Sequence, residues 1–346
     1  MSSTQIKSWR NWFWQEEDDR LRAFWRIALT YTAMVLIALG IQSAVRVVSG
    51  GFVLSADTAP VEVLRLAILL LVLWLVSKYV DKRPFSDYGL TLNKKPFWIE
   101  FLFGLALGVV MITAVFSIQY GLGWISIVGT YVKSVKLGFW LALLIPLINL
   151  IAAALFTELF FRGYLIVNLA ESFNFMRALY QPNPSPGSLS KFRLFLNDSL
   201  FHQSAVMAAW ICGTAFFLWY RLSDNMESSV FILNILRASF MLTLPFIMTR
   251  NLGMPLGINL GWTFFASNIF GLRVQSLILT KTSVLAIVLN GPENYTGGTA
   301  GPESGLIGMG AIVIASGIVM AWVKYRQNHM PPGFDPWYFE YKPLKR

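Results

Sequence analysis

The sequence has little of what soluble enzymes and secreted scaffolds depend on. Its 346 residues include one cysteine, Cys212, and two histidines, His202 and His329. A single cysteine excludes a disulfide within the chain and any metal site built from cysteines. Charged residues make up 13% of the chain and hydrophobic residues 55%, whereas soluble domains carry about 25% charged residues. This composition argues against a soluble enzyme or a disordered chain and predicts a multi-pass membrane protein.

The charges that are present have a basic excess, with a formal net charge of +10. In a soluble protein this excess would suggest a nucleic-acid partner. In a membrane protein, Lys and Arg collect in the cytoplasmic loops. We therefore expect membrane lipid as a partner and no nucleic acid.

Hydrophobic stretches long enough to form spanning helices recur along the whole chain. A span needs about 20 mostly apolar residues, and the stretches do not alternate as strands of a membrane barrel would. We expect an all-α polytopic bundle of about eight transmembrane helices, at residues 25–46, 60–80, 98–120, 139–170, 204–221, 230–249, 254–271 and 306–323.

The basic residues between these stretches predict the orientation and the domain limits. They gather before the first span, after the second, in an insertion at 172–203 and in the tail, which places both termini in the cytoplasm. We divide the chain into an amphipathic segment at 1–24, a membrane domain at 25–324 containing the insertion, and an aromatic and basic tail at 325–346.

Aromatic residues mark both cytoplasmic ends. Trp9 and Trp14 lie among charged residues near the start, and Trp337 lies in the tail. Such a pattern is typical of a short interfacial helix at the start and of contact with lipid or with a partner protein. Arg237, inside the sixth stretch, is a further candidate for such a contact.

A few polar groups lie within the spans, where they are costly and usually mark function or an internal pair. Glu158 and Arg162 are four residues apart on the fourth stretch, and Asn259 and Thr263 are four apart on the seventh. Each pair therefore shares one helix face. Two GxxxG patterns permit close helix approach; they are Gly104 with Gly108 and Gly257 with Gly261.

Five segments around these residues resemble the motifs of the CPBP family, the CAAX proteases and bacteriocin-processing enzymes also called Abi. Three carry the family's functional positions, and two resemble its turn before the third span and its glycine-rich loop before the last. In that order they are Thr157-Glu-Leu-Phe-Phe-Arg-Gly163, Phe216-Phe-Leu-Trp-Tyr220, Gly257-Ile-Asn-Leu-Gly-Trp-Thr263, Asp81-Lys-Arg-Pro-Phe-Ser-Asp-Tyr-Gly-Leu90 and Thr296-Gly-Gly-Thr-Ala-Gly-Pro-Glu-Ser-Gly-Leu306.

The resemblance implies an eight-helix intramembrane fold with a protease centre, and a bacterial cytoplasmic membrane as its setting. In the family, a glutamate and two histidines activate water and an asparagine helps to hold the oxyanion. At those four positions this chain has Thr157, Tyr220, Asn259 and Thr263. The family's second glutamate and its arginine are present as Glu158 and Arg162, and their family role looks structural.

Elementary chemistry agrees with this departure from the family. A general base needs a proton acceptor with a pKa near the working pH, which Thr and Asn lack and which Tyr, with a pKa of about 10, reaches only under strong perturbation. The spans hold no histidine and no cluster with metal-ligand spacing. We expect no catalytic residues, no metal and no cofactor.

Three functions fit the remaining framework, a vestigial pocket formed by the residues at the six motif positions. The first is a pseudoprotease that serves as scaffold, assembly factor or accessory subunit of a membrane complex. The second is an endopeptidase that processes prenylated or leader peptides through an altered site. The third is a lipid-binding or small-molecule-binding membrane protein. The six pocket residues are Thr157, Glu158, Arg162, Tyr220, Asn259 and Thr263.

Overall fold

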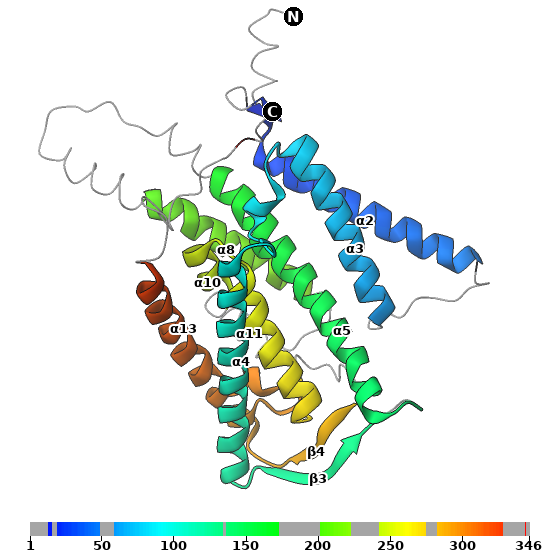
Figure 1. Ribbon diagram of the computed structural model, residues 1–346, viewed down its shortest axis with the longest axis vertical. Coiled ribbons are helices and arrows are strands. Elements are labelled where there is room, and N and C mark those ends of the chain that lie inside the picture. The colour runs from blue at the N-terminus through cyan, green and yellow to red at the C-terminus, as the bar shows by residue number, and fades with distance from the viewer. Residues whose placement is uncertain are drawn as a thin grey trace, which may run out of the picture.

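The protein is a mostly helical bundle with one small sheet at one end (Figure 1). The computed structural model describes residues 13–15, 19–48, 59–133, 136–172, 201–222, 242–274, 282–327 and 343. Within these ranges, five helices are long and apolar enough to cross a membrane. They are Ala23–Ile41, Pro60–Val80, Lys95–Gly121, Phe139–Ser172 and Leu306–Arg326.

These five helices coincide with five of the expected spans, which supports the multi-pass interpretation. The expected span at 204–221 lies in α8 (Phe201–Leu222), whose apolar part is shorter, Val206–Trp219. The one at 254–271 is split between α11 (Gly253–Phe264) and a π-helical turn η6 (Phe265–Ile269). The one at 230–249 falls mostly outside the described residues, which include its last turns as α10 (Leu244–Thr249).

The closest helix pair in the centre of the bundle is α4 (Lys95–Gly121) with α11, which run side by side (Figure 1). A Cβ placed on Gly257 would lie 2.2 Å from the carbonyl oxygen of Phe101, and one on Gly104 would lie 2.4 Å from that of Met254. The backbones therefore meet with no room for a side chain. The close approach expected from the two GxxxG patterns is confirmed.

Another long helix supplies the motif that contains Glu158. It begins as α5 (Phe139–Thr157), continues as the π-helical segment η3 (Glu158–Ile166) and runs to residue 172. All nine residues of η3 are buried. A π-helix is wider than an α-helix, is rare, and often occurs at functional sites, so the backbone widens where the predicted site begins.

The first two spans pack differently from the central ones. The helix α3 (Ala59–Leu75) lies along α5 and ends in a π-helical turn η1 (Val76–Val80). The helix α2 (Ala23–Val48) starts beside the end of α3 and then diverges from the bundle (Figure 1). Among the side chains of α2 that the structure describes, the buried ones are Ala23, Arg26 and Thr30, all within its first eight positions.

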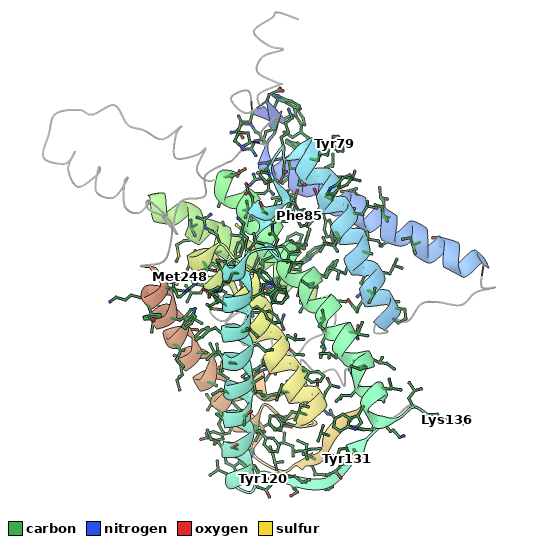
Figure 2. The ribbon with its side chains drawn as sticks, in the orientation of Figure 1. Tyr79, Phe85, Tyr120, Tyr131, Lys136 and Met248 are labelled. Carbon is green, nitrogen blue, oxygen red and sulfur yellow. The ribbon has the colours of Figure 1, made fainter. Side chains whose placement is uncertain are left out.

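Two ends of the bundle can be named from their residues. At one end, which we call the Arg83 end, η1 leads through Arg83 into a short 3-10 turn η2 (Phe85–Tyr88). At the other, the sheet end, β3 (Ile125–Val132) pairs antiparallel with β4 (Ser283–Leu289). Exposed aromatic residues occur at both ends, with Tyr79 at the first and Tyr120 and Tyr131 at the second (Figure 2). Aromatic belts of this kind lie at membrane interfaces.

The sheet is a departure from the all-α expectation. One strand lies between the third and fourth spans and the other lies before the last span. They pair from Ile125 with Leu289 to Val132 with Ser283, where the sequence predicts only loops and turns. The signal for β3 is its β-branched and aromatic composition, Ile125-Ser-Ile-Val-Gly-Thr-Tyr-Val132, which favours a strand. The neighbouring glycine-rich loop does form turns, with left-handed φ at Gly297 and Gly301.

The described part of the N-terminal segment, where the sequence predicts an interfacial helix, contains two short paired strands. Trp14–Gln15 (β1) pairs antiparallel with Arg20–Leu21 (β2), so the described part of this segment is a hairpin. The turn includes Asp19 with φ of 47°, a left-handed conformation that Asp tolerates better than most residues. Residues 1–12, which include Trp9, lie outside the described part of the chain. Most of the tail, including Trp337, also lies outside it.

The last helix, α13 (Leu306–Gln327), closes the bundle against α4. The Trp322 ring stacks on Phe103 with centroids 3.9 Å apart, and its indole N–H donates to the Glu100 carboxylate at 2.9 Å. Glu100 also forms an ion pair with Arg326 at 3.6 Å. These contacts hold the C-terminal part of α13 against the first turns of α4.

Candidate functional site

Glu158 is the centre of a buried polar cluster. It is the first residue of η3, and its side chain is completely buried. The carboxylate atom Oε1 lies 3.3 Å from a terminal guanidinium nitrogen of Arg162 on the same helix. This i,i+4 ion pair is the one expected from the spacing, and it forms even though the local helix is π rather than α.

Arg162 connects this helix to α8. Its guanidinium carbon lies 4.8 Å from the centroid of the Phe217 ring, within the range of a cation–π contact. Phe217 belongs to the segment that resembles the second motif, and Gly213, one turn before it, packs against Ile166. The first and second motif segments are therefore neighbours in space.

Asn259 connects the same carboxylate to α11. Its side-chain amide donates to Glu158 Oε1 at 3.0 Å, and its side-chain oxygen accepts a hydrogen bond from the Thr263 hydroxyl at 3.3 Å. We call Glu158, Arg162, Asn259 and Thr263 the polar core. Four of the six predicted pocket residues thus form one hydrogen-bonded group joining two helices.

The other two predicted pocket residues are not shown to join it. The Thr157 hydroxyl donates to the carbonyl oxygen of Ala153 in its own helix at 2.9 Å. Tyr220 is in α8, but its side chain lies outside the described residues, and so does Arg237. A hydroxyl that bonds its own helix backbone is a common way to satisfy Thr in a span.

Polar residues that follow Thr263 in the sequence extend the polar core toward the sheet end. The Ser267 hydroxyl lies 2.8 Å from both the Thr263 carbonyl oxygen and the Asn268 side-chain oxygen. The Asn268 amide donates to the carbonyl oxygen of Thr282, just before β4, at 2.9 Å. These residues lie outside the predicted pocket, although Ser267 continues the four-residue spacing of Asn259 and Thr263.

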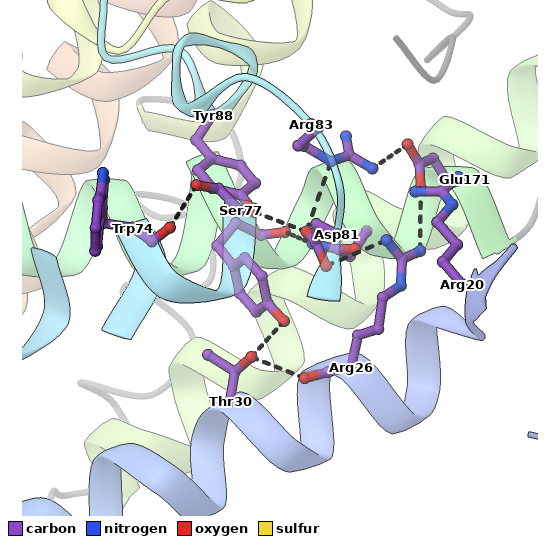
Figure 3. A network of polar contacts seen from close by, with 11 residues as sticks. Arg20, Arg26, Thr30, Trp74, Ser77, Asp81, Arg83, Tyr88 and Glu171 are labelled. Atoms are coloured by element: carbon purple, nitrogen blue, oxygen red, sulfur yellow. Dashed lines mark hydrogen bonds and ion pairs between the residues drawn. The ribbon is translucent and has the colours of Figure 1, made fainter. Parts of the chain in front are cut away.

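A second buried polar group lies at the Arg83 end; Asp81 and Arg83 belong to the segment that resembles the family's turn before the third span, but none of its residues was predicted as a site residue. Three arginines surround two carboxylates (Figure 3). Arg26 bridges Asp81 at 3.2 Å and Glu171 at 3.1 Å. Glu171 also pairs with Arg20 at 3.1 Å and with Arg83. We call Arg20, Arg26, Asp81, Arg83 and Glu171 the ion-pair network.

Neutral hydrogen bonds surround this network. Asp81 accepts from the Tyr88 hydroxyl at 2.7 Å and from the Asn168 amide at 3.0 Å. The Thr30 hydroxyl donates to the Arg26 carbonyl oxygen, so the Tyr164 hydroxyl, 2.7 Å away, donates to Thr30 (Figure 3). The Asp81 side chain is completely buried, and these bonds compensate part of its desolvation.

The protonation states in the network follow from its geometry. Burial would lower the pKa of the Arg83 guanidinium, but the carboxylates of Glu171 and Asp81 raise that pKa above its ordinary value. Burial, and then the adjacent Asp81 carboxylate, raise the pKa of Tyr88 well above its ordinary value. Arg83 is therefore a cation and Tyr88 a neutral donor over the physiological pH range.

The predicted lipid or partner contact at Trp14 has defined neighbours. Its indole N–H donates to the Asp19 carboxylate at 3.2 Å, and the Lys82 ammonium lies 6.0 Å from its ring centroid. Lys82 in turn pairs with Asp19 at 3.1 Å. Trp14 thus helps to attach the N-terminal hairpin to the segment that follows α3, and it is half-buried.

Neither polar group has the donor set of a metal centre. Among the residues that the structure describes, no three His, Cys, Asp or Glu side chains lie close enough together to hold a metal ion. Comparison of the chain with protein-family models, with curated proteins and with solved structures finds no match. Membership of the CPBP family therefore stays a prediction from the five motifs.

Proposed function

We propose that this chain is a non-catalytic membrane protein of the CPBP type that acts as a scaffold, assembly factor or accessory subunit of a membrane complex. The observation that carries this proposal is the use of the Glu158 carboxylate. One of its oxygens, fully buried, contacts both Arg162 and the Asn259 amide. In this geometry the carboxylate ties two helices together.

The neighbouring groups support a structural rather than a chemical role. Activation of a water requires a base that can take up a proton near the working pH. The hydroxyls of Thr157 and Thr263 already donate to a carbonyl and to Asn259, and Asn259 donates its amide to Glu158. At the family's catalytic positions these side chains bond to one another or to their own helix.

The outer surface supports binding to other membrane components. Beyond its first eight residues, the described side chains of α2 are not buried, among them Leu36 and Leu39. A span with so little contact to its own bundle offers a long apolar face to lipid or to a helix of another subunit. Membrane helices associate through such faces by packing and occasional hydrogen bonds.

The test combines native mass spectrometry with a peptidase assay on the full chain in nanodiscs. We expect a protein at fixed stoichiometry in the intact eluate, and no cleavage of prenylated or leader peptides. A lone chain in every mild detergent and in nanodiscs would contradict the scaffold proposal.

The peptidase assay separates the alternative directly. Cleavage that is abolished by Glu158→Gln, and unaffected by Glu62→Gln, would make the chain an endopeptidase. Glu62 is a suitable control because its carboxylate lies in α3, outside the polar core, and pairs with the nearby Arg65 at 2.7 Å.

A further inference from the structure

A pocket of about 290 Å³ lies where the N-terminal hairpin, the start of α2 and the end of the helix Phe139–Ser172 meet. It is separate from the polar core. Its size is at the low end for small-molecule sites, which suits a compact charged group better than a whole drug-sized molecule. The residues that matter for its chemistry are Gln15, Arg22, Phe24, Trp25, Arg26 and Ser172.

The polar lining of this pocket favours an anion. It includes the two cations Arg22 and Arg26 together with the side chains of Gln15 and Ser172, and no acidic residue is among the described residues that line it. The pocket also borders the first turn of α2, which begins at Ala23. The N–H groups and the dipole at a helix start favour negative charge.

Arg26 is held ready for such a ligand. Its side chain is 1% exposed, and its terminal nitrogens are fixed by Asp81 and Glu171. Its Nε atom is buried and makes no hydrogen bond to any group in the described ranges. A buried donor without an acceptor is unfavourable, and an anion in the adjoining pocket would supply the acceptor.

The apolar rim indicates where the anion comes from. Phe24 and Trp25 are 67% and 37% exposed and lie in the first turn of the span that begins at Ala23. Aromatic residues at this position lie at the level of the lipid headgroups. A ligand that places a charge in the pocket and an apolar chain along α2 matches both halves of this surface.

We propose that the pocket formed by Gln15, Arg22, Arg26 and Ser172 binds a phosphate group, supplied by an anionic glycerophospholipid. Arg22 and Arg26 neutralise the phosphate, and Phe24 and Trp25 contact the acyl chains. Binding would add an external anion to a region that is already rich in arginine. The lipid would then be a structural component of the Arg83 end.

The test uses the full chain in nanodiscs that contain phosphatidylglycerol and phosphatidylcholine in equal amounts. Native mass spectrometry should show one phosphatidylglycerol retained after the disc is removed. Arg22→Gln should reduce its retention about fivefold, the effect of one basic residue at an anionic surface. Ser172→Phe, which fills the pocket without changing the charge, should abolish retention.

Two controls distinguish the pocket from general surface charge. Lys95→Gln removes an exposed positive charge at the start of α4, far from the pocket lining, and should leave retention unchanged. Glu16→Gln with Glu17→Gln neutralises the acidic residues next to Gln15 in the sequence and should increase retention. Thermal melting of each variant shows that it is folded.

A second arm identifies the source of the phosphate. Inorganic phosphate at millimolar concentration is added to the detergent-solubilised, delipidated chain, and its melting temperature is followed. Stabilisation by phosphate without retained lipid, lost in Arg22→Gln, would support the anion site and assign it to a soluble phosphate. Equal retention of both lipids, or identical retention by the wild type and Arg22→Gln with no effect of phosphate, would overturn the proposal.

Discussion

The polar core and the ion-pair network are both buried and charged, but they hold different things together. In the polar core, Glu158 and Arg162 are four residues apart on one helix, and the neutral amide of Asn259 on α11 donates a hydrogen bond to Glu158. In the ion-pair network, Glu171 meets Arg26 and Arg83 from 145 and 88 residues away. The polar core joins two helices through a neutral hydrogen bond. The ion-pair network joins separate segments through charge pairs.

This difference indicates where the stability of the bundle is concentrated. Removing one member of a buried ion pair leaves its partner charged and uncompensated, which is strongly destabilising. Hydrogen bonds between membrane helices contribute little by comparison, about 0.6 kcal/mol on average. We therefore expect single charge changes at the Arg83 end to be strongly destabilising, and the polar core to tolerate loss of the Asn259 hydrogen bond better.

Glu171→Gln should have the largest effect. It removes the negative charge that three arginines share, and we expect a loss of about 3–5 kcal/mol in the free energy of unfolding. The measurement is unfolding in bicelles by added SDS, followed by circular dichroism. Glu62→Gln is the matched control and should change the free energy by less than about 1 kcal/mol, because its partner Arg65 is 37% exposed. Equal effects of the two variants would contradict the comparison.

Gly257→Ala should come next and should act on the packing of α4 against α11, the helix that carries Asn259 and Thr263. The added methyl group would meet the Phe101 carbonyl oxygen at 2.2 Å, so α4 and α11 must separate at a cost of about 1–3 kcal/mol. Hydrogen exchange should increase in these two helices and stay unchanged at the start of α2.

Gly310→Ala provides the matched control for that variant. No atom lies within 4 Å of its added Cβ, and Ala is favoured over Gly in a helix. Its stability should therefore be unchanged or slightly higher. A loss of stability as large as that of Gly257→Ala would show that the close approach of α4 and α11 is not the cause.

Asn259→Ala should have the smallest effect, at most about 1.7 kcal/mol, because it removes the hydrogen bond to Glu158 while the Arg162 pair stays in place. A double-mutant cycle with Glu158→Gln measures the coupling between the two side chains. Asn93→Ala, at an exposed position before α4, serves as the neutral control. A coupling energy near zero would mean that Asn259 does not join the helices.

The part of the site that follows from local spacing could be predicted from the sequence. The i,i+4 relation of Glu158 to Arg162 and the GxxxG approach of α4 and α11 depend only on helix geometry. The meeting of Glu158 with Asn259 was suggested by the order of the motifs. In the structure, Arg162 and Asn259 both contact the Glu158 carboxylate. The π-helical segment that contains Glu158 and Arg162 was not predicted from the sequence.

The ion-pair network could not be predicted in the same way. Asp81 and Glu171 lie near the ends of spans, where charged residues ordinarily contact water or headgroups. Nothing in the sequence near Glu171 distinguishes a solvated carboxylate from one that pairs with the arginines of three other segments. Their pairing depends on which helix ends meet, which is a property of the tertiary fold. The hairpin at Trp14 and the β3–β4 pairing were missed for the same reason.

The attachment of α2 at one end has a mechanical consequence. Its 26 residues form a rod about 39 Å long, whose buried side chains, among those that the structure describes, lie in its first turns around Arg26 and Thr30. A rod fixed at one end turns a small rotation into a large excursion. A tilt of about 10° would move its far end by about 7 Å across the plane of the membrane. The network around Glu171 is then the fixed point about which α2 rotates. A change in charge at this point would move the far end of α2 at the opposite face of the bilayer.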